Sequence, residues 1–292
     1  MTEEIRKDCS ECRIEDQTIS RAEDRDRLEQ IRDRIAACDL TIADALARRM
    51  DCVEEIIEYK KEHGMAIFQG DQEKKQRKVL RKRVAGHKYE DEILDVYQEI
   101  VKSSRKVQAR SLFSYNIMLI GFMGSGKTTV ADYLGTMLEM EHVDTDAMIV
   151  NWMGMSISDM FRNYGETYFR NLESNTLLAL RERKQLIVSC GGGITLRPEN
   201  VETMRSRGVV VWLTATPETV YDRLHLFTDR PLLNGNMNIP YIAKLMKERE
   251  PRYVNAADVR IATDGLTVRE VCEILVKRVL EFQKARDFRI KE

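Results

Sequence analysis

Residues 117–129 read Ile-Met-Leu-Ile-Gly-Phe-Met-Gly-Ser-Gly-Lys-Thr-Thr, and this stretch decides the fold of the C-terminal part of the chain. A short apolar run leads into the pattern GxxxxGKT, and a segment with helical apolar spacing follows. In such a loop the glycines let successive backbone N–H groups and a helix N-terminus point at one anion. An ordinary glycine-rich turn is the alternative, but the flanking strand and helix patterns favour a phosphate-binding loop.

This loop predicts a nucleotide site. Lys127 is expected at the β- and γ-phosphates and Thr128 at Mg²⁺. The residues predicted to bind the nucleotide are Gly121, Gly124, Ser125, Gly126, Lys127, Thr128 and Thr129.

Length and composition limit the number of domains and the kinds of partner that the chain can have. A chain of 292 residues, 43% hydrophobic and 33% charged, is long enough for two domains. Its net charge of -1 gives no general attraction to nucleic acid or to anionic membranes. No apolar run approaches the roughly 20 residues that span a bilayer, and the acidic start lacks the features of a signal peptide. We therefore expect a cytoplasmic protein with neither a nucleic-acid nor a membrane partner.

The six cysteines are scattered, which predicts free thiols rather than a disulfide framework. Cys9 and Cys12 form a CxxC, but without a second pair of ligands this is at best half a zinc site. A charged tail over residues 1–25, disordered or a frayed helical extension, is the favoured interpretation.

The spacing of apolar residues differs between the two halves of the chain. From Leu28 to about Tyr59 the apolar or small residues recur at three- and four-residue spacing without Pro or Gly, which predicts one long helix. Shorter helices are predicted at about residues 72–84 and 89–111. After Leu112, short β-rich runs alternate with helical segments, as in a parallel sheet covered by helices. These runs are residues 115–120, 186–189, 209–213 and 258–262.

The predicted organisation is a tail (1–25), an all-α three-helix domain (26–112) and an α/β domain with a P-loop (113–292). No flexible linker separates the two domains near residues 111–114. The third helix is therefore expected to run almost directly into the first strand.

The α/β half carries further polar groups. Asp144 and Asp146 are two positions apart, on the same side of a predicted extended segment, so that one could serve a metal and the other a hydroxyl. Solvated turn residues are the alternative. Arg170 and Glu173 lie one helical turn apart, for which the alternative is a surface ion pair. The run Cys190–Gly193 would let a ligand approach the backbone closely.

Residues 226–238 contain Gly, Asn and the sequence Asp229-Arg230-Pro231, and they look like a mobile lid that carries one cation. In this order and spacing the motifs resemble those of the shikimate kinases over residues 115–280, ending with Arg249-Glu-Pro-Arg-Tyr253. The resemblance implies ATP-dependent phosphorylation of a ring hydroxyl of shikimate, in a nucleoside-monophosphate-kinase-like fold. Phosphoryl transfer depends mainly on positioning and on charge neutralisation, which these residue types can supply.

On the nucleotide side, the resemblance implies that Lys127 holds the β- and γ-phosphates. Thr128 and Asp144 would serve Mg²⁺, the latter through water. Arg230 would close over the transferring phosphoryl group, and Arg223 would lie along the adenine.

On the substrate side, the resemblance implies that Asp146 orients or deprotonates the attacking hydroxyl. The substrate carboxylate would lie between Arg170 and Arg249, with Glu173 steadying Arg170. Backbone contacts would come from Gly192 and Gly193.

The helical half has cations of its own. Arg49 occupies a position between Ala45 and Val53 where the apolar spacing calls for a hydrophobe, and a buried arginine needs an anion. Lys60 is eleven residues on, nearly on the same face and about 16 Å along the axis. Two long cationic side chains could therefore converge on one small dianion.

Arg32 precedes Arg49 by about 25 Å and lies on another face of the helix, so within one chain it cannot share a small ligand with Arg49. If Arg32 joins the site, it must come from an antiparallel second copy, which predicts a homodimer. Ser104 and Gln108 interrupt the apolar face of the third helix, and Glu73 is expected to point the same way from the second. A plain three-helix dimerisation module is the alternative, but it leaves this polar set without partners.

This constellation resembles the all-helical chorismate mutases over about residues 26–111. The resemblance implies a cofactor-free rearrangement of chorismate to prephenate. Arg49 and the partner chain's Arg32 would hold the two carboxylates, and Lys60 and Gln108 would donate to the ether oxygen. The residues implied to hold the ring hydroxyl and neighbouring groups are Glu73 and Ser104.

One departure from that family lies just before Glu73. Where its members usually read DxxRE, this chain has Gln69-Gly-Asp-Gln72-Glu73, so one cation and one carboxylate are absent. The sequence predicts a bifunctional enzyme of aromatic amino-acid biosynthesis. The alternative is a monofunctional shikimate kinase whose helical domain dimerises it or senses a ligand.

Overall fold

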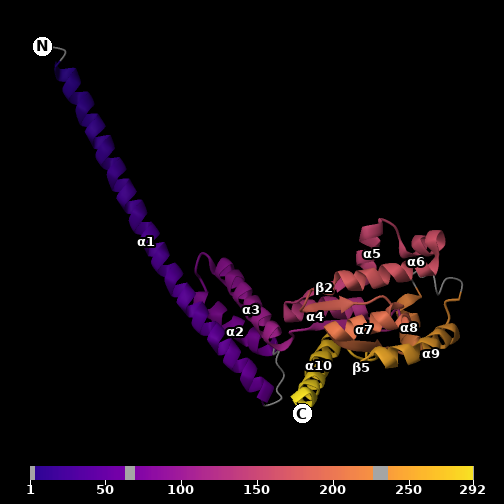
Figure 1. The fold of residues 1–292 in the computed structure, drawn as a ribbon. Helices are drawn as coiled ribbons and strands as arrows, with labels where there is room; N and C mark the ends of the chain where they lie inside the picture. The colour runs from indigo at the N-terminus through magenta and orange to yellow at the C-terminus, as the bar shows by residue number, and fades with distance from the viewer. Residues whose placement is uncertain (1–3, 63–69, 226–235, 292) are drawn as a thin grey trace. The chain divides into compact units, whose positions relative to one another are not determined.

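The computed structural model describes residues 4–62, 70–225 and 236–291, and the side chains of residues 25–60, 72–225 and 236–286 (Figure 1). The chain divides into two compact units, Met1–Glu58 and Tyr59–Glu292. The first unit contains most of one long helix. The second contains the two shorter helices together with the α/β part.

The three predicted helices of the N-terminal half are present. They are α1 (Glu4–Glu62), α2 (Gly70–Val84) and α3 (Glu90–Leu112). α1 begins well before Leu28, so the charged N-terminal residues form a helical extension. Residues 1–62 contain no Pro or Gly, and Glu, Lys and Arg are good helix formers.

Burial along α1 is lower than its apolar spacing suggests. Arg49 is half-buried, and Ala45, one turn before it, is exposed. The apolar positions Leu28, Ile31 and Ile35 are also exposed on this helix. The periodicity was therefore a correct guide to the helix, and these positions remain open to solvent in the single chain.

The α/β part is built on a five-stranded parallel sheet in the order β2-β3-β1-β4-β5. The strands are β1 (Asn116–Ile120), β2 (Glu141–Asp144), β3 (Leu186–Ser189), β4 (Gly208–Thr214) and β5 (Val259–Ala262). The predicted fold class is thus confirmed, together with four predicted strands. β2 was missed because it is an edge strand, and its first two residues, Glu141 and His142, are exposed and polar.

Helices cover both faces of the sheet, as a parallel sheet requires. α4 (Lys127–Leu138) and α10 (Val268–Lys291) pack on one face. Met118 and Ile120 point to the other face, where they form a core with side chains of α6 (Ile157–Ala179), α7 (Pro198–Arg207) and α9 (Ile239–Ala256). The remaining helices are α5 (Thr145–Met153), α8 (Pro217–Leu224) and the 3-10 turn Ile194–Leu196.

The predicted absence of a linker is confirmed. α3 ends at Leu112, β1 begins at Asn116, and Phe113 between them is completely buried. Its ring meets that of Tyr115 edge-on, with 6.0 Å between centroids.

Among the described residues, no helix is long and apolar enough to cross a bilayer. The predicted cytoplasmic location stays a prediction. Cys38, Cys52, Cys190 and Cys272 are free thiols, as expected. Cys9 and Cys12 lie outside the described side chains.

Candidate active sites

The first site lies where three neighbouring strands end. Because β2, β3 and β1 are adjacent and parallel, the loops that follow them meet at one edge of the sheet, the usual place for a ligand in an open α/β fold. A cleft of about 900 Å³ opens there. Its lining includes Lys127, Asp144, Asp146 and Gly192 from these loops, and cations from three further helices: Arg170, Arg223 and Arg249.

The phosphate loop has a backbone that only glycine fits. Gly121 has φ 146°, and a side chain there would meet Leu213 O and lie 2.9 Å from Ser125 Oγ. Gly126, at φ 92°, is the N-cap of α4. Lys127 Nζ donates to Gly121 O and Phe122 O, both at 3.0 Å. The loop and the N-terminus of α4 therefore present a cationic, donor-rich surface to the cleft, which suits a phosphate.

Oxygen ligands for a metal lie beside this loop. Thr128 Oγ1 donates to Asp144 Oδ2 at 2.8 Å and lies 3.4 Å from Ser189 Oγ. Hydroxyl and carboxylate oxygens are the donors that Mg²⁺ prefers, so these residues fit that ion.

The predicted extended segment around the two aspartates was wrong. Asp144 Oδ1 accepts from the backbone N–H groups of Asp146 (3.0 Å) and Ala147 (3.1 Å), which makes Asp144 the N-cap of α5. Asp146 therefore lies in the first turn of a helix. Both aspartates nevertheless line the cleft.

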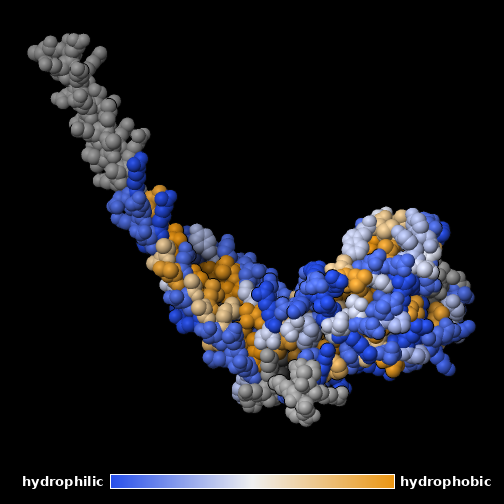
Figure 2. Space-filling model, in the orientation of Figure 1, coloured by the Kyte–Doolittle hydropathy of each residue, from blue (hydrophilic) through white to orange (hydrophobic). Residues whose placement is uncertain are grey.

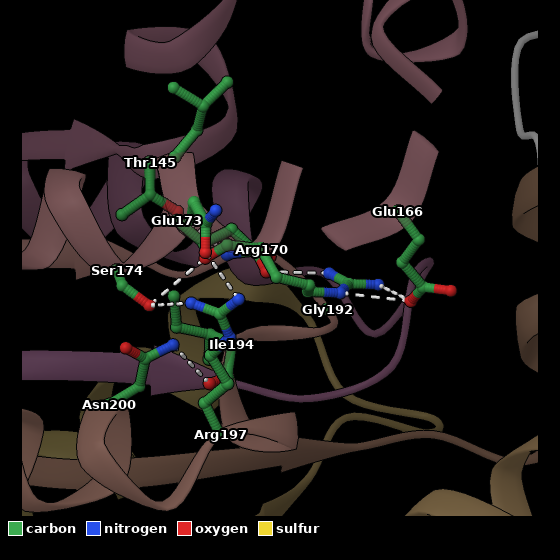
Figure 3. Close-up of polar contacts among 12 residues, drawn as sticks. Thr145, Glu166, Arg170, Glu173, Ser174, Gly192, Ile194, Arg197 and Asn200 are labelled. Carbon is green, nitrogen blue, oxygen red and sulfur yellow. Dashed lines mark hydrogen bonds and ion pairs between the residues drawn. The ribbon is translucent and has the colours of Figure 1, made fainter. Parts of the chain in front are cut away.

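Arg170 is buried between two acidic residues of its own helix (Figure 3). Its Nη1 donates to Glu173 Oε2 at 2.7 Å, and Nε and Nη2 donate to Glu166 Oε1 at 3.1 and 2.7 Å. Glu173 is fully buried. The alternative of a surface ion pair is therefore wrong, and the guanidinium is held rigidly at the wall of the cleft.

The glycine run packs against these charged groups. A side chain on Gly191 would lie 2.8 Å from Glu173 Oε1 and would also meet Asp146 Oδ1. The Gly191 N–H donates to Thr145 Oγ1 at 2.9 Å. Gly193 leaves room for the Arg170 guanidinium in the same way. The run thus lets Asp146 and Glu173 approach the same stretch of backbone.

The second cation is anchored next to this run. Gly192 O accepts from the Tyr253 hydroxyl at 2.7 Å and from Arg249 Nη1 at 3.5 Å. Arg223 Nη1 donates to Gly124 O at 2.9 Å, beside the phosphate loop. Arg230 lies outside the described residues.

Sequence reasoning missed three contributors to this site. Glu166 precedes Arg170 by four residues, so the i, i+4 rule for helices could have found it. Tyr253 ends the motif that begins at Arg249, but the sequence predicts no role for it. No local signal points to Gly191 in preference to its neighbours, because its importance comes from side chains far away in the sequence.

The electrostatics of Glu173 are unusual. Burial raises the pKa of its carboxyl to about 7, although the Arg170 guanidinium acts in the opposite direction and Asp146 adds to the rise. Glu173 can therefore change its charge near neutral pH while it lies between the arginine and the aspartate.

A second polar set lies in the helical part of the larger unit. Burial lowers the pKa of Lys60, at the end of α1, and the charge of Glu73 on α2 opposes this shift, so the two groups lie within electrostatic reach. On α3, Ser104 is buried and donates to Ile100 O at 2.9 Å, and Gln108 is half-buried. Arg105, which lies between them, donates from Nε to Glu73 Oε1 at 3.0 Å.

Some predicted members of this second set are not brought together by these contacts. Arg32, which is exposed, and Arg49 belong to the first unit, and their parts in a site stay predictions. Gln69 lies outside the described residues, and Gln72 is exposed.

A phosphate loop that faces an aspartate and two arginines across one cleft has the arrangement of a small-molecule kinase of the P-loop class. A sequence profile described as shikimate kinase matches residues 123–280. The chain belongs to the shikimate kinase family. A second profile, chorismate mutase type II, matches residues 31–109. The chain is therefore a bifunctional enzyme of aromatic biosynthesis.

Individual relatives agree with this assignment. The shikimate kinase of Thermoanaerobacter pseudethanolicus is 38% identical over 169 residues, which cover 58% of this chain and 98% of that protein. The enzyme of Geobacter metallireducens is 43% identical over 156 residues, 53% of this chain and 87% of the relative. A solved shikimate kinase from Acinetobacter baumannii in complex with shikimate is 32% identical, with a TM-score of 0.57 over 59% of this chain and 97% of its own.

The raised pKa of Glu173 predicts a pH-dependent cost of folding. In the unfolded chain the carboxyl ionises near its ordinary value of 4.5, whereas in the folded protein it ionises near 7. The contribution of this carboxyl to the unfolding free energy is therefore fully present below about pH 4.5, and it is lost as the pH rises to about 7. Relative to Glu173→Gln, which cannot ionise, the parent protein should lose up to about 3 kcal/mol of unfolding free energy across this range.

Urea titrations of both proteins at several pH values would measure this difference. The gap should open between pH 4.5 and 7 and stay constant above that. Stability curves that run parallel through this range would contradict the raised pKa.

Proposed function

We propose that the α/β part transfers the terminal phosphoryl group of ATP to a ring hydroxyl of shikimate, and that the helical part rearranges chorismate to prephenate. One observation carries the kinase proposal: the phosphate loop faces Asp146, Arg170 and Arg249 across one cleft. The resemblance to known shikimate kinases supplies the identity of the substrate.

ATP and Mg²⁺ fit the residues of the loop. The backbone N–H groups of residues 121–126 and Lys127 would hold the phosphates, and Thr128 with Asp144 would hold the metal. Arg223 would lie near the adenine end, and Arg230 would act on the phosphoryl group. The nucleotide supplies the phosphoryl group when bound, and the metal neutralises part of its charge.

The acceptor would be held by charge on one side and by shape on the other. Its carboxylate would pair with Arg170 and Arg249, with Glu173 holding Arg170 and with Gly192 and Gly193 contributing backbone contacts. The apolar side chains that line the cleft would contact the carbon ring: Val150, Ile157, Phe161 and Phe169. Asp146 would accept a hydrogen bond from the attacking hydroxyl and take its proton as the oxygen bonds to the γ-phosphorus, while the bond from that phosphorus to the β–γ bridging oxygen breaks and ADP leaves. Catalysis would come mainly from this positioning.

For the mutase, the supporting observation is the half-buried Lys60 close to Glu73. Lys60 and Gln108 would donate to the ether oxygen as negative charge grows on it, and Glu73 and Ser104 would hold the ring hydroxyl. Arg49 and the partner chain's Arg32 would hold the two carboxylates. No acid, base or cofactor is required, because the protein confines a flexible dianion and stabilises the charge that develops on its ether oxygen.

A homodimer is part of the same proposal. Exposed apolar residues recur along α1 at helical spacing, and hydrophobic side chains are visible among hydrophilic ones along this helix (Figure 2). They are Leu28 (46% exposed), Ile31 (43%), Ile35 (56%) and Ile42 (54%). These positions fall within one stripe of the helix surface, which suits pairing with a second copy. The domain limits 26–112 and 113–292 remain part of the proposal, and the two matched segments support them.

The kinase proposal predicts shikimate-dependent ADP formation by the purified protein. Asp146→Asn should lower kcat by about 10²- to 10⁴-fold, because general-base assistance is lost. Arg249→Gln should raise KM for shikimate by about 10- to 100-fold, through loss of a charged hydrogen bond. Lys247→Gln, an exposed change on the same helix, serves as the control. A parent protein that forms no ADP with shikimate would exclude the proposal.

The mutase proposal predicts that purified protein consumes chorismate and that Lys60→Ala lowers kcat by about 10²- to 10³-fold, as for the loss of one donor to a developing oxyanion. Lys102→Ala, an exposed lysine of α3 paired with Glu99, is the control. Turnover that does not depend on Lys60 would contradict the assignment. In that case an effect of chorismate on kinase rates would favour the alternative, a ligand-sensing module.

The dimer proposal predicts a mass of twice 34.0 kDa by light scattering. Ile35→Glu, in the exposed stripe, should shift the protein towards monomer and lower mutase activity with it, because Arg32 comes from the partner. Leu40→Glu changes a residue that is 69% exposed on another side of α1 and should leave the dimer intact. A monomer with full mutase activity would refute the assignment of Arg32.

A further inference from the structure

Arg105 on α3 is held between two carboxylates. Its Nε and Nη2 each donate to one oxygen of Glu73 on α2, the first at 3.0 Å. Its Nη1 lies 4.0 Å from Glu139 Oε1, at the end of helix α4 in the α/β part. The Arg105 side chain is 28% exposed and that of Glu73 is 34% exposed. A two-pronged guanidinium–carboxylate pair at this depth fixes both side chains more firmly than a surface ion pair does.

The place of Arg105 in the sequence matters as much as its contacts. It directly follows Ser104 and precedes Gln108 by three residues, so it rises from the part of α3 that carries the predicted mutase groups. The position before Glu73, where the resembling family has an arginine, is here the exposed Gln72. Position 72 therefore carries no cation, and Arg105 brings one to the Glu73 carboxylate from the neighbouring helix.

We propose that Arg105 is a positioning residue of the mutase site: it holds the Glu73 carboxylate in place and supplies the cation that position 72 lacks. This inference rests on the proposed mutase function. A carboxylate has about four acceptor positions, and Arg105 occupies two of them, which leaves others for a substrate hydroxyl. The fixed guanidinium also adds positive charge beside Glu73, whose carboxylate lies within electrostatic reach of Lys60.

Arg105 could instead have a purely structural role, through its contact with the Glu139 carboxylate. Through Glu139, Arg105 also ties α3 to α4, so its removal could loosen the junction without any bearing on Glu73. Glu139→Gln removes this second contact and leaves the pair with Glu73 untouched. It is therefore the matched control for every effect of Arg105.

The test measures chorismate turnover and shikimate-dependent ADP formation on the full chain. Arg105→Gln should lower the kcat of the mutase by about 10- to 100-fold, the cost of a misplaced catalytic group. Arg105→Lys should recover part of this loss, because it keeps the charge but not the two-pronged geometry. Kinase kcat should stay within about twofold in both variants, and Glu139→Gln should leave both activities near those of the parent.

A double-mutant cycle shows whether Arg105 acts through Glu73. In a Glu73→Gln background, Arg105→Gln should cost less than about twofold further, since the group that it positions is already gone. If Arg105→Gln also lowers kinase activity, the variant is partly misfolded. Arg105→Lys is then the deciding variant: it should keep normal kinase activity and recover part of the mutase activity.

Three results would overturn the inference. In the first, Arg105→Gln leaves the kcat of the mutase unchanged. In the second, it lowers this kcat as much in the Glu73→Gln background as in the parent. In the third, Glu139→Gln lowers the kcat as much as Arg105→Gln does. Each of these leaves the mutase function itself standing. Absence of chorismate turnover by the parent protein would instead remove the mutase function, and this inference with it.

Discussion

Parallel pairing of β2, β3 and β1 determines where the kinase chemistry can take place. In this register Asp144 and Leu119 both lie level with Ser189, so the three strands end at nearly the same height. The phosphate loop, the aspartates and the glycine run then leave the sheet side by side. A slip of one residue in any strand would turn its side chains to the opposite face and break up the constellation. The geometry of the site is thus set by the backbone before any charged group makes contact.

Charge balance is the second constraint on this site. A buried guanidinium is costly unless it is paired, and Arg170 meets the condition with Glu173 on one side and Glu166 on the other. Glu173 in turn lies near Asp146, so two acids share the space above Gly191. Because the glycine lacks a side chain, this crowded cluster of charges can form without displacing the backbone.

The parts of the structure that depend on local sequence could be predicted. The phosphate loop was found because its glycines, lysine and threonine are contiguous, and the helices of the N-terminal half were found from their spacing. β2 was not, because Glu141 and His142 give an edge strand no apolar pattern. The sequence predicts extended chain at the first turn of α5, because the hydrogen bond from Asp146 N–H to the Asp144 side chain forms only once the backbone has turned. The contacts of Gly191 and Arg105 join segments far apart in the sequence, which no local pattern reports.

The connection between α3 and β1 bears on how such a fusion can be inherited. Phe113 is completely buried, and the chain passes from helix to strand within three residues, so the last turn of one catalytic half is also part of the core of the other. A gene cut at this point would yield a kinase with an exposed aromatic side chain and a helix pair without its support. Recombination that exchanged either half for a homologue would have to preserve this shared segment. Separation or exchange of the two halves is therefore expected to lower stability at this shared segment, because it would expose apolar surface that is now buried.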